Sequence, residues 1–231
     1  MNTGIFFYYQ QGERLRDFPQ ALDDVLGKDN VFLYDGHYPS KPASSFDLCP
    51  IPPDAIQKVH SEGMIRRVME TGAYEGALYS ASGTFEAARR ICAGELTNAF
   101  VFTGYGDHHA GSVFFGGGCY FNGAAIAIRE MREKYGMTRF AIVDTDAHHG
   151  DGTWELFGND PHVLYICFCG NASYEENNNV NIQVPEKIND HDYVKMARHV
   201  FEKCFTDHRP EMIFWNWGYD GTRGDYGDIG L

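Results

Sequence analysis

Short apolar segments alternate with longer segments of helical periodicity along most of this chain. The apolar, β-rich segments predict strands over residues 4–9, 31–34, 98–103, 140–143, 162–168 and 212–217. The amphipathic segments predict helices over residues 17–26, 53–59, 61–70, 84–93, 120–135 and 190–205, with a further helix beginning at 153. Polar or proline-containing stretches at 39–53 and 171–181 are expected to be loops.

This alternation is typical of the α/β class, in which a mostly parallel β-sheet carries helices on both faces. No internal repeat and no linker divides the sequence, so we expect residues 1–231 to form a single domain. The alternation stops at Leu231 without a closing helix or a cap signal. We therefore expect this domain to be truncated at its C-terminal end.

The chemistry is concentrated directly after the apolar segment 140–143. Ionisable side chains follow this predicted strand within a few residues: Asp144, Asp146, His148, His149 and Asp151. Open α/β sheets place their ligands at the carboxyl ends of buried strands. This stretch is therefore the main candidate for a functional site.

The spacing in this stretch favours a metal ion. In an extended segment alternate side chains share a face, so Asp144, Asp146 and His148 would point the same way. Imidazole and carboxylate together suit zinc, and also manganese or iron. A catalytic zinc site needs three protein ligands and an open position. Asp146 and His148 can supply two of these ligands, and Asp144 could orient a neighbouring imidazole.

Two further loops follow predicted strands and carry groups of the same kind. The strand 98–103 leads into a glycine-rich loop with the adjacent pair His108 and His109. The last strand leads into a loop that holds Asp220, Asp225 and Asp228. Any of these aspartates could supply the missing metal ligand, and spacing alone does not choose among them.

Composition narrows the classes of function. The formal net charge of the 231 residues is -13, which argues against nucleic acid as the main ligand and is compatible with a cationic substrate. We expect neither a secretory leader nor a membrane span, because no apolar run is long enough. Cys167 and Cys169 share a face of a predicted strand and are expected to be structural thiols in a reducing compartment. The expected location is the cytoplasm.

With these clusters identified, the sequence resembles the zinc-dependent histone deacetylase family of the arginase/deacetylase fold. Residues 144–152, Asp-Thr-Asp-Ala-His-His-Gly-Asp-Gly, are close to the metal-binding signature of that family. The other similar segments are 59–62, which precedes the first helices, 108–110 with 117–122, which carries the paired histidines, and 218–220 with 224–225, which bears the last metal ligand.

The resemblance implies a hydrolase that removes an acetyl or similar acyl group from an amine or a lysine side chain. Asp146, His148 and Asp225 would be the zinc ligands. A structural potassium ion beside Asp144 is also implied. The expected partner is an acylated amine or acetyl-lysine substrate, with no nucleic acid and no membrane. The sequence is silent on the oligomeric state.

The resemblance also assigns the histidine pair. His108 and His109 would be the catalytic dyad, with Asp144 paired to His108 and Asp151 paired to His109. An imidazole can take the proton of the attacking water and later protonate the leaving amine. We assign that role to His109 and electrostatic support to His108. A buried carboxylate behind each imidazole would fix its tautomer.

The chain departs from the family pattern at positions that bear on the substrate. Gly118 stands where the family usually has an aromatic wall of its active-site tunnel, and Phe114 or Phe115 could fill that role instead. Cys167 stands where the family often has a cation-binding serine. The family's transition-state tyrosine comes from a turn further downstream than Leu231.

Two alternative functions remain at this point. One is a dimanganese ureohydrolase of the same fold, whose site would need extra carboxylates for a second metal. The order His148-His149-Gly-Asp151 favours a single zinc, because His149 stands where such a carboxylate would be more useful. The other is a non-catalytic binding domain that keeps the metal for stability.

Overall fold

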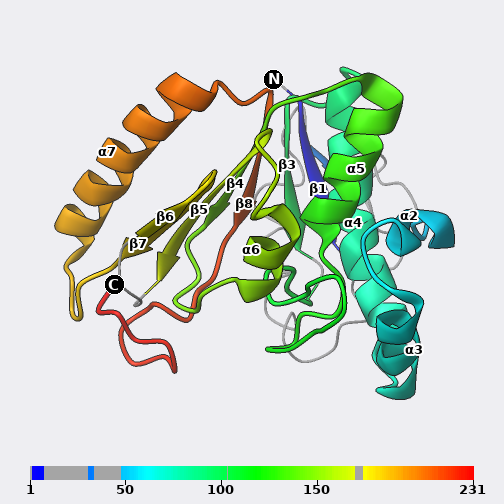
Figure 1. Cartoon of the computed structure of the whole chain (residues 1–231), viewed down its shortest axis with the longest axis horizontal. Helices are drawn as coiled ribbons and strands as arrows, with labels where there is room; N and C mark the ends of the chain where they lie inside the picture. The colour runs from blue at the N-terminus through cyan, green and yellow to red at the C-terminus, as the bar shows by residue number, and fades with distance from the viewer. Residues whose placement is uncertain (1, 8–30, 34–47, 103, 170–173) are drawn as a thin grey trace. The chain divides into compact units, whose positions relative to one another are not determined.

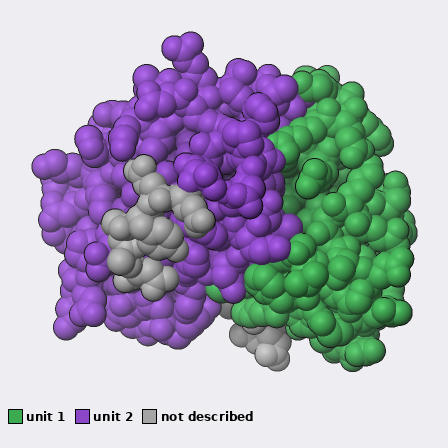
Figure 2. Space-filling model, viewed as in Figure 1, with its two compact units in different colours: residues 1–136 green, residues 137–231 purple. Residues whose placement is uncertain are grey.

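The computed structural model describes residues 2–7, 31–33, 48–102, 104–169 and 174–231, with the backbone alone for residues 7, 31–33 and 174–176. The chain divides into two compact units, Met1–Gly136 and Met137–Leu231. Figure 2 colours the two units separately. Each unit contains its own parallel sheet and its own helices, and each is described by itself.

The sheet of the first unit has the strand order β2-β1-β3, and both pairings are parallel. Its strands are β1 (Thr3–Phe7), β2 (Val31–Leu33) and β3 (Asn98–Phe102). Its described helices are α2 (Pro53–Gln57), α3 (Glu62–Glu70), α4 (Tyr74–Cys92) and α5 (Gly123–Tyr135). The strands predicted at 4–9, 31–34 and 98–103 are confirmed where they are described. The predicted helix 17–26 and most of the predicted loop 39–53 lie outside the described residues.

Helix α4 begins ten residues before the predicted helix 84–93. Its first half contains Gly76, Ser80, Ser82 and Gly83, residue types that favour helices weakly on their own. Ala77, Ala81 and Gly83 are nevertheless buried. A Cβ added at Gly123 of α5 would lie 3.2 Å from the Cα of Ala81, so the two helices approach closely there. Close packing between helices, rather than intrinsic propensity, therefore extends α4.

Side-chain caps fix where two other helices begin. The Ser61 hydroxyl accepts a hydrogen bond from the Met64 backbone N–H at the start of α3. The Asn122 side chain does the same for the Ala125 N–H, so α5 begins at residue 123 rather than at the predicted 120. Such caps satisfy backbone donors that have no partner within the helix.

The sheet of the second unit has the strand order β6-β7-β5-β4-β8. Its pairings are parallel except for the antiparallel pair of β6 and β7. The strands are β4 (Phe140–Asp144), β5 (Val163–Cys169), β6 (Tyr174–Glu176), β7 (Asn179–Gln183) and β8 (Met212–Asn216). The helices are α6 (Asp151–Phe157) and α7 (Asp190–His208).

The predicted loop 171–181 is wrong in its second half. Residues 174–183 contain β6 and β7, and β7 extends the parallel sheet beside β5. The many asparagines in this segment favoured a loop prediction, because Asn is usually depleted in strands. Asn179 and Asn181 are buried and use their side chains for polar contacts within the unit. Val180 packs in the apolar core on the opposite face.

The two faces of this second sheet differ in chemistry. Helix α7 covers one face, where Val143, Ile166 and Phe168 pack with residues of the helix. Alternation along the strands places Asp144, Tyr165, Cys167 and Cys169 on the other face. Figure 1 shows α6 on the side of the sheet away from α7. These polar and sulfur-containing side chains therefore lie on the α6 side of the sheet.

Parallel sheets combined with helices confirm the predicted α/β class. The prediction that residues 1–231 form a single domain stays a prediction. Among the described helices, none combines the length and the apolar character that crossing a lipid bilayer requires.

Glu211 joins the starts of β4 and β8 through a charged hydrogen-bond cluster. Its carboxylate accepts from the backbone N–H groups of Arg139 and Thr138, at 2.8 and 2.9 Å, and from the Thr138 hydroxyl at 3.0 Å. These backbone donors lower the pKa of Glu211 from 4.5 to about 2. The ionised form is thus favoured in the folded protein.

We predict that Glu211→Gln lowers the free energy of unfolding near neutral pH, because the amide is a weaker acceptor than the carboxylate. The folded-state pKa is depressed, so the advantage of the wild type is full above about pH 4.5 and shrinks as the pH falls towards 2. Urea denaturation across this pH range measures the difference. Glu186→Gln, at an exposed position, is the control, and a wild-type advantage that does not depend on pH would contradict the prediction.

Candidate metal centre

Three of the predicted donor residues gather beyond the carboxyl end of β4. The ligand atoms of Asp146, His148 and Asp220 all lie within 4.8 Å of one another. Asp146 and His148 follow β4 directly, and Asp220 follows β8. The structure therefore brings together the two ligands expected from the signature segment and one aspartate of the last loop.

The pairing of β4 with β8 explains why Asp220 reaches this group. Asp144 pairs with Asn216 at the ends of the two strands, so the loops that follow start side by side. The backbone N–H of Ala147 donates to Oδ1 of Asp220 at 3.1 Å. A Cβ added at Gly218 would lie 2.4 Å from Oδ2 of Asp146 and 2.6 Å from its Cα. Only a residue without a side chain lets the loop pass this close to Asp146.

The acceptor atoms in this group converge on one imidazole nitrogen. Nδ1 of His148 lies 3.1 Å from Oδ1 of Asp146 and 2.6 Å from Oδ2 of Asp220. Oδ2 of Asp220 is buried, and it has no partner in hydrogen-bond geometry among the described residues despite this short approach. A buried carboxylate oxygen without a hydrogen bond is costly. A cation bound by all three side chains would relieve that cost, so the donor set fits a metal ion.

Asp225, the ligand expected from the resemblance, is not in this group. The structure places Asp225 in an exposed turn, where its Oδ1 accepts from the Tyr226 backbone N–H at 2.7 Å. Asp228 is also exposed, and its side chain accepts from the N–H groups of Gly224 and Gly230. Of the three candidate aspartates, Asp220 alone is buried. The geometry thus replaces Asp225 with Asp220 in the candidate ligand set.

Asp144 is fully buried at the end of β4, just before the metal group. Its Oδ1 accepts from the Asp146 backbone N–H at 3.2 Å, and its Oδ2 accepts from the Tyr165 hydroxyl at 2.7 Å. Burial and the nearby Asp144 carboxylate raise the pKa of Tyr165 well above its usual value, so Tyr165 remains a neutral donor. No role was predicted for Tyr165, because a tyrosine in an apolar strand gives no sign of its partner.

Asp151 begins helix α6 and is exposed. Its Oδ1 accepts from the neighbouring Gly152 backbone N–H at 3.0 Å. A carboxylate in the first turn of a helix is favoured by the helix dipole. The loop between β4 and α6 thus supplies Asp146 and His148 of the metal group, with a carboxylate at each end.

The histidine pair lies in the loop that precedes α5 in the first unit. The rings of His108 and His109 are in contact, with centroids 4.1 Å apart. His108 is buried, whereas His109 is partly exposed. A Cβ added at Gly117 would lie 2.4 Å from Cδ2 of His109, and Gly117 has a φ of +56°. Gly117 therefore lets the backbone pass directly against the His109 ring.

His60 holds this loop in place, although no role for it was predicted from the sequence. It is buried, its Nδ1 lies 2.8 Å from the Gly111 carbonyl oxygen, and its Nε2 accepts from the Asn122 backbone N–H at 3.0 Å. Because a carbonyl only accepts and an N–H only donates, His60 is neutral with its proton on Nδ1. The short segment 59–62, noted only as a resemblance, was the available signal.

Phe115 packs against the helices of the first unit. Its ring contacts Tyr120, with centroids 5.4 Å apart, and lies beneath the Arg67 guanidinium at 6.0 Å. Phe115 also joins an apolar cluster with Met64. These contacts give Phe115 a packing role, and the prediction that Phe114 or Phe115 replaces the aromatic wall missing at Gly118 stays a prediction.

Comparisons with known proteins agree with the resemblance. The family model described as histone deacetylase domain matches residues 55–229. The chain belongs to the histone deacetylase family. A probable deacetylase of Archaeoglobus fulgidus is 28% identical over 251 residues, covering 95% of this chain and 69% of that protein. Histone deacetylase HDA1 of Candida albicans is 31% identical over 173 residues, covering 66% of this chain and 21% of that protein.

A solved structure supports the fold of this histone deacetylase relative. The crystal structure of the HDA15 HD domain matches with a TM-score of 0.80 and 22% sequence identity, covering 98% of this chain and 74% of that one. At this identity the match speaks for the fold alone, and it agrees with the predicted arginase/deacetylase type. The chain spans about a fifth of the length of the Candida albicans relative.

The described residues hold one other group that could bind a metal, formed by His149, Cys167 and Cys169. Two thiols and an imidazole do not suit manganese, which prefers oxygen ligands. This second group therefore gives no support to a dimanganese ureohydrolase. Family membership likewise favours a deacetylase-type site over a ureohydrolase-type site for the carboxylate-rich group, which consists of Asp146, His148 and Asp220.

We predict that Gly218→Ala disturbs the metal group, because the new methyl group would overlap Asp146. Overpacking of this kind costs about 1–3 kcal/mol in stability. Urea denaturation and zinc titration of the purified chain measure the two effects, and both stability and zinc affinity should fall. Gly63→Ala is the control, because a Cβ there meets nothing within 4 Å. Equal behaviour of the two variants would contradict the close approach at Gly218.

Proposed function

We propose that this protein is a zinc-dependent hydrolase that removes an acetyl or similar acyl group from an amine or a lysine side chain. Membership of the histone deacetylase family supports the reaction class. The observation that carries the proposal is the convergence of Asp146 and the buried Oδ2 of Asp220 on Nδ1 of His148.

Asp146, His148 and Asp220 would hold the zinc ion. Two carboxylates and one imidazole give a ligand set of the size found in catalytic zinc sites, where a further position stays open. Bound zinc would polarise the amide carbonyl and lower the pKa of water towards ~7. The side chain of His148 is 42% exposed, so the group is accessible to a substrate.

The surrounding groups would hold these ligands in position. The Ala147 N–H holds Oδ1 of Asp220, which leaves Oδ2 to face His148. The His148 backbone N–H donates to Oδ1 of Asp146 at 2.9 Å. The Asp144 carboxylate accepts hydrogen bonds from the Tyr165 hydroxyl and from the Asp146 backbone N–H. Fixed outer partners of this kind preserve ligand geometry, and their loss typically lowers metal affinity 10–100-fold.

His109 would act as general base and then as general acid, and His108 would supply electrostatic support. Family resemblance carries this assignment, together with the pairing of Asp144 to His108 and of Asp151 to His109. The partial exposure of His109 is compatible with proton exchange with a substrate. The buried position of His108 suits a supporting role.

The substrate class follows from the reaction class and from charge. An acylated amine or an acetyl-lysine side chain would be the partner, and the net charge of -13 is compatible with substrates that carry further positive charge. The structural potassium ion beside Asp144 and the cytoplasmic location remain predictions from the sequence.

We predict that Asp220→Asn lowers the zinc content by one ion per chain and abolishes acyl release, because the uncharged amide is a poor zinc ligand. Asp225→Asn should leave both properties close to those of the wild type. Elemental mass spectrometry and release of acetate from an acetylated lysine peptide are the measurements. If Asp225→Asn abolished both properties and Asp220→Asn spared them, the ligand assignment would be reversed.

We predict that His109→Ala retains the zinc ion but slows turnover by about 10²–10⁴, the usual contribution of a general acid–base group. Zinc content, measured on the same samples, separates loss of catalysis from loss of metal. Turnover unchanged from the wild type would remove His109 from the mechanism.

A further inference from the structure

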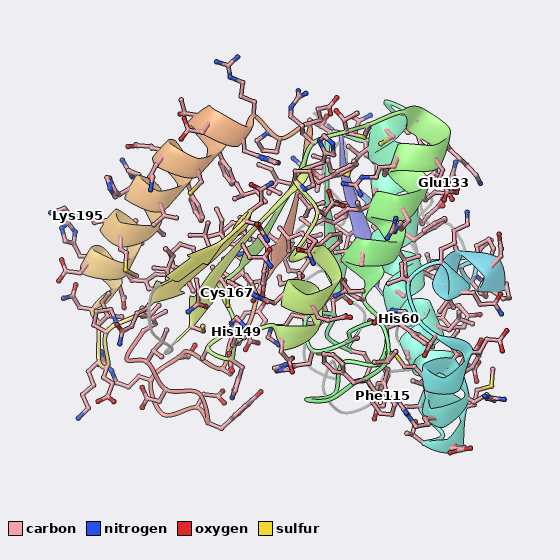
Figure 3. All side chains as sticks on the ribbon, in the orientation of Figure 1. His60, Phe115, Glu133, His149, Cys167 and Lys195 are labelled. Atoms are coloured by element: carbon pink, nitrogen blue, oxygen red, sulfur yellow. The ribbon has the colours of Figure 1, made fainter. Side chains whose placement is uncertain are left out.

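A second cluster of metal-ligating side chains lies on the α6 side of the second sheet. It consists of His149, Cys167 and Cys169, whose ligand atoms all lie within 4.8 Å of one another. Cys167 and Cys169 are alternate residues of β5 and share a face of the sheet. His149 comes from the loop between β4 and α6. Figure 3 labels His149 and Cys167, which lie near each other beside α6.

The spacing of these atoms is close to that of a coordination sphere. Nδ1 of His149 lies 3.8 Å from Sγ of Cys169. Zinc bonds of ~2.3 Å to sulfur and ~2.0–2.1 Å to nitrogen at a tetrahedral angle place such atoms about 3.6 Å apart. A small contraction would therefore close the cluster around an ion. Within the described part of the chain, neither Cys167 nor Cys169 forms a disulfide.

Polar groups around the cluster suit metal-bound thiolates. Oδ1 of the buried Asn181 accepts from the Cys169 thiol at 3.0 Å and lies 3.2 Å from Nδ1 of His149. Rotation of this amide by half a turn would present its NH₂ group to a thiolate instead. An outer donor of this kind tunes and orients a metal ligand. The contact with the Cys169 thiol, burial and the nearby Asp144 carboxylate raise the pKa of Cys167, so a cation would have to displace the thiol proton on binding.

The cluster is more buried than the carboxylate-rich group, although His149 itself is partly exposed. Cys167 and Cys169 are fully buried, and the rings of His149 and Trp154 are in contact, with centroids 5.1 Å apart. Structural metal sites are closed by their ligands, whereas catalytic sites keep an open position. Burial and donor type thus both favour a structural ion over a catalytic one.

We propose that His149, Cys167 and Cys169 form a second metal site, specific for a thiophilic cation such as Zn(II) or Cu(I). Soft thiolate ligands select these ions over magnesium, calcium and manganese. Cu(I) accepts three ligands, and Zn(II) would recruit a fourth, for which the Asn181 carboxamide is a candidate because it contacts both Cys169 and His149. The site is separate from the proposed catalytic group and does not depend on deacetylase activity.

The test uses cadmium, a thiophilic analogue of zinc, with the full chain. We expect the wild type to bind two cadmium ions and to show thiolate-to-cadmium charge-transfer absorption. The double variant Asp146→Asn/Asp220→Asn should bind one ion with that absorption intact. The double variant Cys167→Ser/Cys169→Ser should bind one ion without it. As a matched control, Cys49→Ser/Cys204→Ser removes two thiols outside the cluster and should behave as the wild type.

One measurement decides the matter even if the Cys167→Ser/Cys169→Ser variant fails to fold. X-ray absorption of the cadmium-loaded Asp146→Asn/Asp220→Asn variant should show sulfur ligands. Loss of all bound cadmium from this folded variant, or an ion surrounded by oxygen and nitrogen alone, would overturn the proposal. Acetyl-lysine hydrolysis is not a readout here, so failure of the proposed catalytic function would be recognised separately.

Discussion

The parallel pairing of β4 with β8 is the constraint on which the candidate metal centre depends. The last paired residues are Asp144 of β4 and Asn216 of β8, so the loops that follow the two strands begin next to each other. Two loops that are far apart in sequence then run side by side, and the Ala147 N–H can reach Asp220. A shift of one residue in this pairing would turn each side chain of one strand to the opposite face. The metal group is thus a consequence of strand register as much as of residue type.

Several buried polar groups lie on the face of the second sheet that is opposite α7. Asp144, Tyr165 and Asn181 are all buried there. An unpaired buried polar group costs about 1–3 kcal/mol or more, so each needs a partner. Tyr165 donates to Asp144, and Asn181 accepts from Cys169. This network keeps the loop after β4 in one arrangement, which a set of metal ligands requires.

The sequence was most informative where local spacing decides the structure. The apolar run 140–143 was predicted correctly as a strand, because a strand pattern depends on neighbouring residues. The donors that follow it stay a predicted site. The choice of Asp220 over Asp225 depends on how two strands pair, which local spacing does not encode. His148 lies four residues after Asp144, and Asp220 lies four residues after Asn216, the residue that pairs with Asp144. This equal spacing along the chain could have favoured Asp220 as a partner of His148.

Tertiary packing accounts for the other differences from the sequence-based expectations. The first half of α4 has weak helix formers, and its burial against α5 overrides that weakness. The strand β7 contains asparagines that read as a loop, yet their side chains find partners such as the Trp154 carbonyl. In both segments the energetic gain comes from residues distant in the sequence, which a single sequence does not reveal.

The neighbours His148 and His149 lie in one short loop and would serve two different kinds of site. Nδ1 of His148 faces two carboxylates in a partly exposed group, whereas Nδ1 of His149 faces Cys169 and Asn181 in a more buried one. Hard oxygen donors with access to solvent suit an ion that must exchange water for substrate. Soft, buried sulfur donors suit an ion that stays in place. An ion held at His149 would also restrain the backbone of His148, so the more buried site would support the geometry of the partly exposed one.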